Sequence, residues 1–148
     1  MNSNPITQLE QLTVNTESKS YLKEIANWTF FFSILGFISI AFLLLIGIFS
    51  SFIIDTLPEA QTAQVPFDLG TILTVMYISF AVIYFLPMYY LMQFSTKMKK
   101  ALVTKNDEML AEALGVLKSH YKFIGVLTII MISLYVLLIV ASVFGALV

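Results

Sequence analysis

Side chains that could catalyse a reaction are sparse in this 148-residue sequence. Its one histidine is His120, and Glu112 is the carboxylate best placed to act with it as an acid–base pair. The two residues are eight positions apart, which on a helix corresponds to a rise of about 12 Å and is too far for a direct hydrogen bond. We therefore expect no catalytic residues and predict that the protein is not an enzyme.

Metal and cofactor chemistry is also restricted, because the chain contains no cysteine. This excludes disulfides, thiolate nucleophiles, cysteine-ligated zinc, iron–sulfur clusters and covalently attached haem. A single histidine cannot build a site of several histidine ligands. The three acids Asp55, Glu59 and Asp68 are spread along a connection, whereas calcium needs densely clustered oxygen ligands. We predict no metal site and no cofactor.

The cationic side chains are eight lysines, with no arginine, in a chain of net charge −1. Guanidinium groups are the usual choice for bidentate phosphate capture, so no nucleic-acid partner is predicted. Lys97, Lys99 and Lys100 directly follow an apolar run, and we predict that they contact anionic lipid headgroups, at about 1 kcal/mol per cation. The alternative is that these lysines only orient the chain in the membrane, and both roles are compatible.

Three long apolar runs dominate the sequence, which is 59% hydrophobic. They cover residues 25–54, 69–96 and 123–148, and none of them contains Asp, Glu, Lys, Arg or His. Each run exceeds the roughly 20 residues that a helix needs to cross a bilayer. The predicted fold is an all-α integral membrane protein with three transmembrane helices and the lipid bilayer as its constant partner.

The distribution of lysines predicts the orientation of these helices. Two lysines precede the first run, none lies between the first and second, six lie between the second and third, and none follows. Short loops rich in lysine stay in the cytoplasm. We therefore expect a cytoplasmic N-terminus and an extracytoplasmic C-terminus. Aromatic residues that suit the headgroup region lie near the predicted inner boundary: Trp28, Tyr89, Tyr90 and Tyr121.

Apolar residues at helical spacing continue beyond the second run to about Val103 and resume from Leu110 to Tyr121. The second and third spans are therefore predicted to form one long antiparallel hairpin, whose tip extends roughly 15–20 Å into the cytoplasm. There we expect Leu114 and Leu117 to be buried. The predicted organisation is a flexible cytoplasmic tail (1–15) and a single membrane domain (16–148), with spans at about 29–54, 69–93 and 123–147, an outer loop (55–68) and a cytoplasmic helical hairpin (94–122).

Polar residues at the expected starts of helices predict their N-caps. Residues 16–18 are expected to cap the first helix and Asp68 the second. Thr104 or Asn106 is expected to cap the third, followed by acids that complement the helix dipole.

Pro87 lies inside the second span and is expected to kink it, because it frees the carbonyl of Ile83. A fixed bend and a working hinge both remain open, and we favour the fixed bend.

Small residues four positions apart mark predicted helix-packing faces, since lipid gives no hydrophobic drive and backbones must approach closely. The two pairs are Gly47 with Ser51, and Ala141 with Gly145. Packing within the chain explains these pairs as well as oligomerisation does.

Several segments resemble a family of small bacterial membrane proteins that is known only as a domain of unknown function. They are 84–94 (YFLPMYYLMQF), 99–102 (KKAL), 117–125 (LKSHYKFIG), 28–30 (WTF) and 35–38 (LGFI). The resemblance extends over about residues 21–135 and depends on the placement of aromatic residues, proline and glycine. It implies a bacterial inner-membrane location and a helical hairpin core, and it implies no activity.

The spans contain no charged residue, and intramembrane charges are the usual mark of proton relays and ion paths. We therefore predict a non-catalytic integral membrane protein. Its expected role is that of an accessory or structural subunit that packs with other membrane proteins or with itself. The alternative is a homo-oligomeric pore or a lipid-interacting membrane protein.

Overall fold

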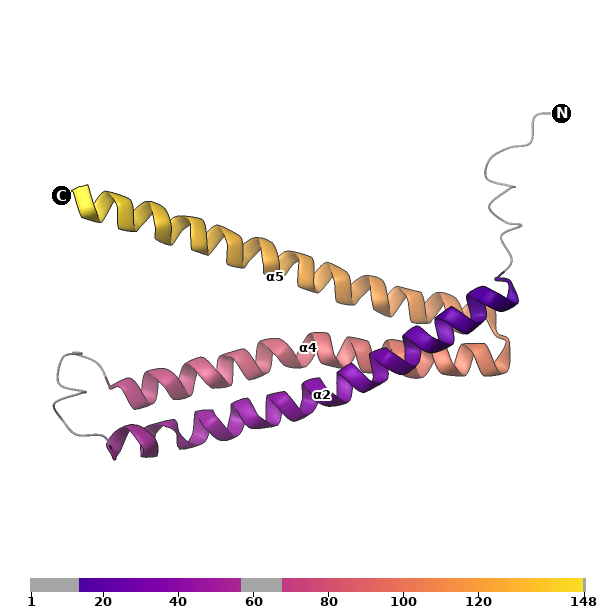
Figure 1. Ribbon diagram of the computed structural model, residues 1–148, viewed down its shortest axis with the longest axis horizontal. Coiled ribbons are helices and arrows are strands. Elements are labelled where there is room, and N and C mark those ends of the chain that lie inside the picture. The colour runs from indigo at the N-terminus through magenta and orange to yellow at the C-terminus, as the bar shows by residue number, and fades with distance from the viewer. Residues whose placement is uncertain (1–13, 57–67, 148) are drawn as a thin grey trace.

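The computed structural model describes residues 14–56 and 68–147, which form three long helices and no strand. The helices are α2 (Thr16–Asp55), α4 (Leu69–Thr104) and α5 (Asp107–Leu147). By length and composition, each is apolar enough to cross a membrane. Figure 1 shows them as three elongated rods, with α2 and α4 side by side. The prediction of an all-α fold with three such helices is confirmed, while most of the predicted tail and outer loop lies outside the described residues.

Each helix is longer than a bilayer crossing requires. α2 has 40 residues, α4 has 36 and α5 has 41. At a rise of about 1.5 Å per residue they extend over roughly 54–62 Å, against about 30 Å of hydrocarbon. The first helix begins at residue 16 and continues without a break through its apolar run. α4 likewise continues without a break through Pro87.

Side chains close the N-termini of α2 and α4. The cap of α2 is Asn15, one residue before the predicted segment, and its Oδ1 accepts a hydrogen bond from the Ser18 N–H at 2.7 Å. Asp68 caps α4 as predicted, accepting from the Gly70 N–H at 3.1 Å and from the Thr71 hydroxyl. The Thr71 hydrogen bond stabilises the carboxylate and so lowers the pKa of Asp68 below its usual value.

The connection between α4 and α5 is a tight turn. Lys105 adopts the left-handed conformation with φ 52°, and the Asn106 N–H donates to the Ala101 carbonyl at 3.2 Å. Asn106, one of the two predicted candidates, then caps α5 by accepting from the Met109 N–H at 3.0 Å. We call the end of the molecule that holds this turn the turn end.

α2 and α4 pack against each other along a seam of small residues. The buried side of α2 includes Ala26, Ser33, Ile40 and Gly47, which are spaced by seven residues. A seven-residue spacing keeps one face of a helix turned toward a neighbour that crosses at a small angle. The resulting α2–α4 contact is the most extensive between any two helices of the described chain.

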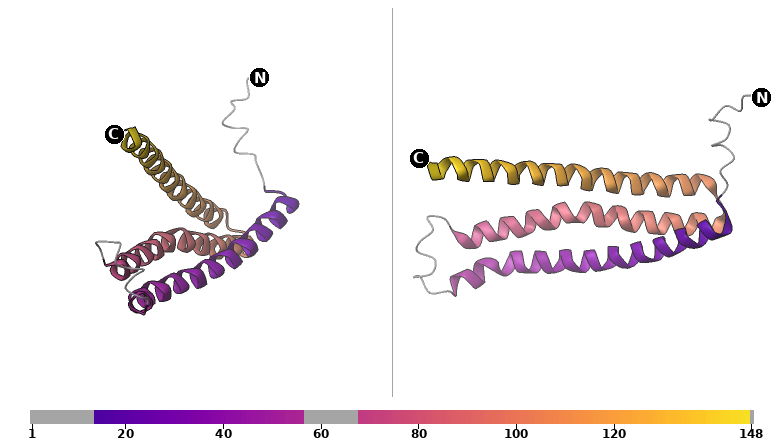
Figure 2. Two further views of the ribbon diagram at one scale, coloured as in Figure 1. Left: turned by 60° about the vertical axis from the view of Figure 1, so that its left-hand side comes forward. Right: turned by 45° about the horizontal axis from the view of Figure 1, so that its top comes forward.

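All three helices meet at the turn end, as both views of Figure 2 show. Here Ala26, Phe94, Met98 and Ala113 form a buried cluster, which we call the three-helix core. Partly buried apolar side chains surround it: Leu22, Leu102, Leu110, Val116 and Leu117. The core joins the segment before the first predicted span to the hairpin tip.

The expected burial of Leu114 is wrong, since 46% of this residue is exposed. Ala113 is fully buried in its place, and Leu117, which was expected to be buried, is partly buried beside the core. Consecutive residues on a helix point about 100° apart, because 3.6 residues complete a turn. The buried face of α5 therefore passes through residue 113 and leaves residue 114 on the flank.

The second half of α5 leaves the other two helices. Figure 1 shows α5 diverging from α4 toward the C-terminus, and Figure 2 agrees in both views. Every side chain from residue 128 to residue 145 is exposed. We call these residues the C-terminal segment of α5.

Candidate functional site

The two residues considered as an acid–base pair, Glu112 and His120, each contact other residues and not each other. Glu112 forms an ion pair with Lys97, whose Nζ lies 2.9 Å from its Oε2. His120 instead lies against α4, with its Nδ1 3.1 Å from the Pro87 carbonyl oxygen. Among the described residues, no group of three His, Asp or Glu side chains could hold a metal ion. The arrangement indicates structural roles for both residues.

The contact between His120 and Pro87 ties α5 to α4. A carbonyl oxygen can only accept, so His120 must donate, which assigns the proton to Nδ1. Pro87 is fully buried there. The sequence drew attention to the carbonyl of Ile83, and the structure adds this bond to the carbonyl of Pro87 itself. The choice between a fixed bend and a hinge at Pro87 stays a prediction.

The lysines predicted to contact lipid also make contacts within the chain. Lys97 is paired with Glu112, and the Nζ of Lys99 lies 4.4 Å from the ring centroid of Phe30, a cation–π contact. Lys100 is exposed. This contact draws the ammonium of Lys99 back toward the apolar run of α2. The lipid contact of these three lysines stays a prediction.

We expect the Lys97–Glu112 pair to contribute little to stability. Its side chains are 41% and 56% exposed, and exposed ion pairs are typically worth less than about 1 kcal/mol. Lys97→Gln, Glu112→Gln and the double variant, unfolded thermally in detergent, form a double-mutant cycle that gives the coupling energy. A coupling energy above about 2 kcal/mol would show that the pair is shielded from water.

Side-chain hydroxyl groups form hydrogen bonds between α2 and α4 at both ends of the seam. Near the turn end, the buried Ser95 hydroxyl donates to the Ala26 carbonyl at 2.6 Å. At the other end, the Ser50 and Thr74 hydroxyls lie 2.7 Å apart, and Ser51 lies 3.3 Å from Thr74. Such bonds between helices satisfy polar groups that lipid cannot.

Glycines allow the two helices of the seam to approach. A Cβ atom added to Gly47 would lie 3.1 Å from the Cβ of Tyr77, and one added to Gly70 would lie 2.9 Å from the Cα of Ser51. The predicted packing residues Gly47 and Ser51 thus both lie at this seam. Sequence reasoning did not single out Gly70.

A third glycine, Gly36, was also missed. A Cβ added there would overlap the Sδ of Met88, so the thioether occupies the space that glycine leaves. Beside this contact is an apolar groove of about 770 Å³ between α2 and α4, walled by Phe32, Phe80 and Tyr84. The groove is open along one side of the helix pair.

The C-terminal segment of α5 makes none of these contacts. The hydroxyls of its Ser and Thr residues donate to carbonyls of their own helix, each at 2.8 Å, as with Thr128 and Ser142. Tyr135 is 66% exposed, and its hydroxyl has no hydrogen-bond partner among the described residues. The predicted packing residues Ala141 and Gly145 lie here too, and the space beside Gly145 is open.

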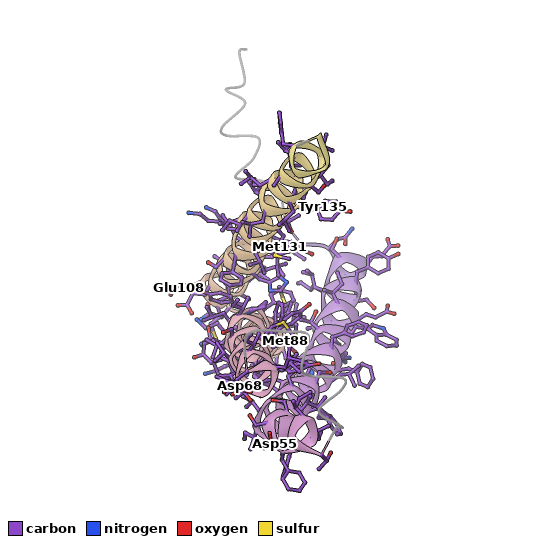
Figure 3. The ribbon with its side chains drawn as sticks, turned by 90° about the vertical axis from the view of Figure 1, so that its left-hand side faces the viewer. Asp55, Asp68, Met88, Glu108, Met131 and Tyr135 are labelled. Carbon is purple, nitrogen blue, oxygen red and sulfur yellow. The ribbon has the colours of Figure 1, made fainter. Side chains whose placement is uncertain are left out.

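Figure 3, viewed along the helices, shows which way this segment faces. Met131 and Tyr135 leave α5 on the side turned toward α2 and α4, while Met88 lies between those two helices. The segment therefore presents to its own chain a face that meets no other helix.

A family model described as a family of unknown function (DUF5362) matches residues 66–143, which is more than half of the chain. The matched region begins just before α4 and includes most of α5. The resemblance to a family of unknown function is thereby confirmed. No curated protein and no solved structure matches the chain.

Proposed function

We propose a non-catalytic role in the membrane for this chain, which belongs to the family of unknown function DUF5362. It acts as an accessory or structural subunit that packs with other membrane proteins or with itself. The observation that carries this proposal is the exposure of every side chain in the C-terminal segment of α5. α2 and α4 share a seam of small residues and hydroxyl bonds, whereas this segment has an apolar surface available to another helix.

The proposed topology places the chain in the bacterial inner membrane, with α4 and α5 as a long antiparallel hairpin. The N-terminus and the turn end lie in the cytoplasm, and the C-terminus lies outside. The lysine distribution supports this orientation. Helix lengths support a hairpin that extends beyond the bilayer, because roughly 54–62 Å of helix exceeds about 30 Å of hydrocarbon, and the three-helix core lies in the excess at the turn end.

Single-cysteine variants test the orientation, since the natural chain contains no cysteine. Thr56 ends α2 and Asn106 lies in the α4–α5 turn, and both residues are exposed. In intact cells, a membrane-impermeant maleimide should label Thr56→Cys, and it should label Asn106→Cys only after permeabilisation. Labelling of Asn106→Cys in intact cells, with Thr56→Cys protected, would contradict the topology.

A second candidate is interaction with lipid, which the groove of about 770 Å³ beside Gly36 favours. Its apolar lining suits an acyl chain, and Lys97, Lys99 and Lys100 suit an anionic headgroup. Native mass spectrometry from nanodiscs separates the candidates. A bound protein, or a second copy, supports the subunit role, whereas retained phospholipid alone supports the lipid role.

A further inference from the structure

We infer that the C-terminal segment of α5 is a lid, which closes onto α4 and covers the apolar groove beside Gly36. In the closed form, the α4–α5 contact continues from the first half of α5 into its second half. The inference rests on the proposed function for its consequence, which is regulation: closure withdraws the surface that a partner helix would use.

The first argument is the register of the existing α4–α5 contact. Phe94 and Ala113 share the three-helix core, and His120 bonds to the carbonyl of Pro87. From the core to this bond the contact moves seven residues back along α4 and seven forward along α5. Equal steps in opposite directions are what an antiparallel pair of helices requires, so the register can be extended from these two contacts.

The same register continues past the point where α5 diverges. Eleven residues beyond Pro87 and His120, about three helical turns, the same faces return, and Met76 of α4 is opposite Met131 of α5. Three residues further, Leu73 is opposite Leu134. Met76 and Met131 are both exposed, and Met131 leaves α5 on the side turned toward α2 and α4 (Figure 3). Two apolar faces of one chain are therefore in register, and each can cover the other.

The second argument is that the membrane favours closure and no charge opposes it. Residues 69–96 and 123–148 contain no charged side chain, so no like charges meet. Helices associate in lipid through van der Waals packing and the entropy of released lipid. A rotation of α5 about the contact between His120 and Pro87 replaces lipid contacts on two faces by contacts between them.

The third argument links closure to the groove. Phe80 is one of the groove walls, and the register places it opposite Leu127. Leu127 is the last partly buried residue before the exposed residues 128–145. The groove therefore opens on the side of α4 that the lid approaches, and closure withdraws the groove and the partner surface together.

Disulfide formation within one chain tests closure, since the natural chain contains no cysteine. The variant with Met76→Cys and Met131→Cys is treated in native membranes with a membrane-permeant oxidant, and the remaining free thiols are counted on the denatured chain with a polyethylene glycol maleimide. We expect both thiols to be lost at the monomer mass of 16.7 kDa. The control combines Met76→Cys with Ile129→Cys, which is exposed on the opposite side of α5, and it should keep both thiols.

Leu73→Cys with Leu134→Cys provides a second pair in the same register. Free thiols in both pairs, or equal oxidation in the control, would overturn closure. The subunit role would then stand, because a segment that stays open remains available to a partner helix. Oxidation of both pairs, with only single chains in native mass spectrometry from nanodiscs, would overturn the subunit role and leave closure standing.

A photoactivatable lipid tests whether the closed segment covers the groove. The probe is a phosphatidylglycerol with a diazirine on its acyl chain, in phosphatidylglycerol vesicles that hold the Met76→Cys, Met131→Cys variant. We expect the reduced variant to be labelled at Phe80 and Tyr84 in the groove, and the oxidised variant to lose this label. Phe52 is exposed and lies outside the groove, so its labelling should be the same in both forms. Equal labelling of the groove before and after oxidation would overturn the lid.

Discussion

Phe94→Ala is expected to destabilise the chain by about 3–5 kcal/mol, the usual cost of truncating a buried phenylalanine. Phe94 is 1% exposed and packs in the three-helix core with Ala26, Met98 and Ala113. Each of the three helices contributes to this cluster, so the cavity weakens contacts of α2, α4 and α5 at once. α5 is the most sensitive, because its contacts with α4 are confined to its first half.

Thermal unfolding in detergent, followed by circular dichroism, measures the effect. Val103→Ala is the matched control, because it shortens an apolar side chain on the same helix at a position that is 83% exposed. We expect the control to stay within about 0.5 kcal/mol of the parent. If both variants unfolded with the parent, the stability of the molecule would not depend on the core at the turn end.

The helices and their ends were predictable because their causes are local. Apolar runs and continuing helical spacing place α2, α4 and α5, and the caps Asp68 and Asn106 depend on a side chain that reaches two or three residues along the chain. Leu114 was mispredicted for a reason that is not local. The stripe of α5 includes both residue 113 and residue 114, and the approach of α2 and α4 decides which of them turns inward.

The contacts between helices were not predictable from the sequence in the same way. Ser95 bonds to the carbonyl of Ala26 across 69 residues, and His120 bonds to that of Pro87 across 33 residues. Nothing in a single sequence fixes how far one helix slides along another, so such partners cannot be named from it. One signal was available, since Ala26, Ser33, Ile40 and Gly47 recur every seven residues along α2 and mark the seam, whereas the predicted packing pairs are spaced by four.

Because α2 and α4 approach closely, replacing glycine by alanine is expected to change the free energy of unfolding in opposite directions at Gly70 and Gly125. Gly70 lies in the seam, where an added Cβ would lie 2.9 Å from the backbone of Ser51. Gly125 lies on α5, and a Cβ added to it would have nothing within 4 Å. Neither glycine has a positive φ, so alanine suits both backbones and the difference between the two sites is steric.

Gly70→Ala should therefore lower the free energy of unfolding by about 1–3 kcal/mol, the usual cost of overpacking, because backbone rather than a flexible side chain has to move. The shift would also separate Ser50 from Thr74, whose hydroxyls now lie 2.7 Å apart. Gly125→Ala should leave stability unchanged or raise it by up to about 1 kcal/mol, through the higher helix propensity of alanine.

Denaturant titration of the two variants beside the parent, in one detergent, gives the comparison directly. The opposite signs matter more than either magnitude, because a general effect of replacing glycine in an apolar helix would shift both variants the same way. Equal shifts would mean that the backbones at Gly70 are not held in contact, and the α2–α4 seam would then be looser than its hydroxyl bonds imply. A loss confined to Gly70→Ala would show that the seam is a fixed unit, in which the backbones of α2 and α4 are held in contact at Gly70 and Ser51.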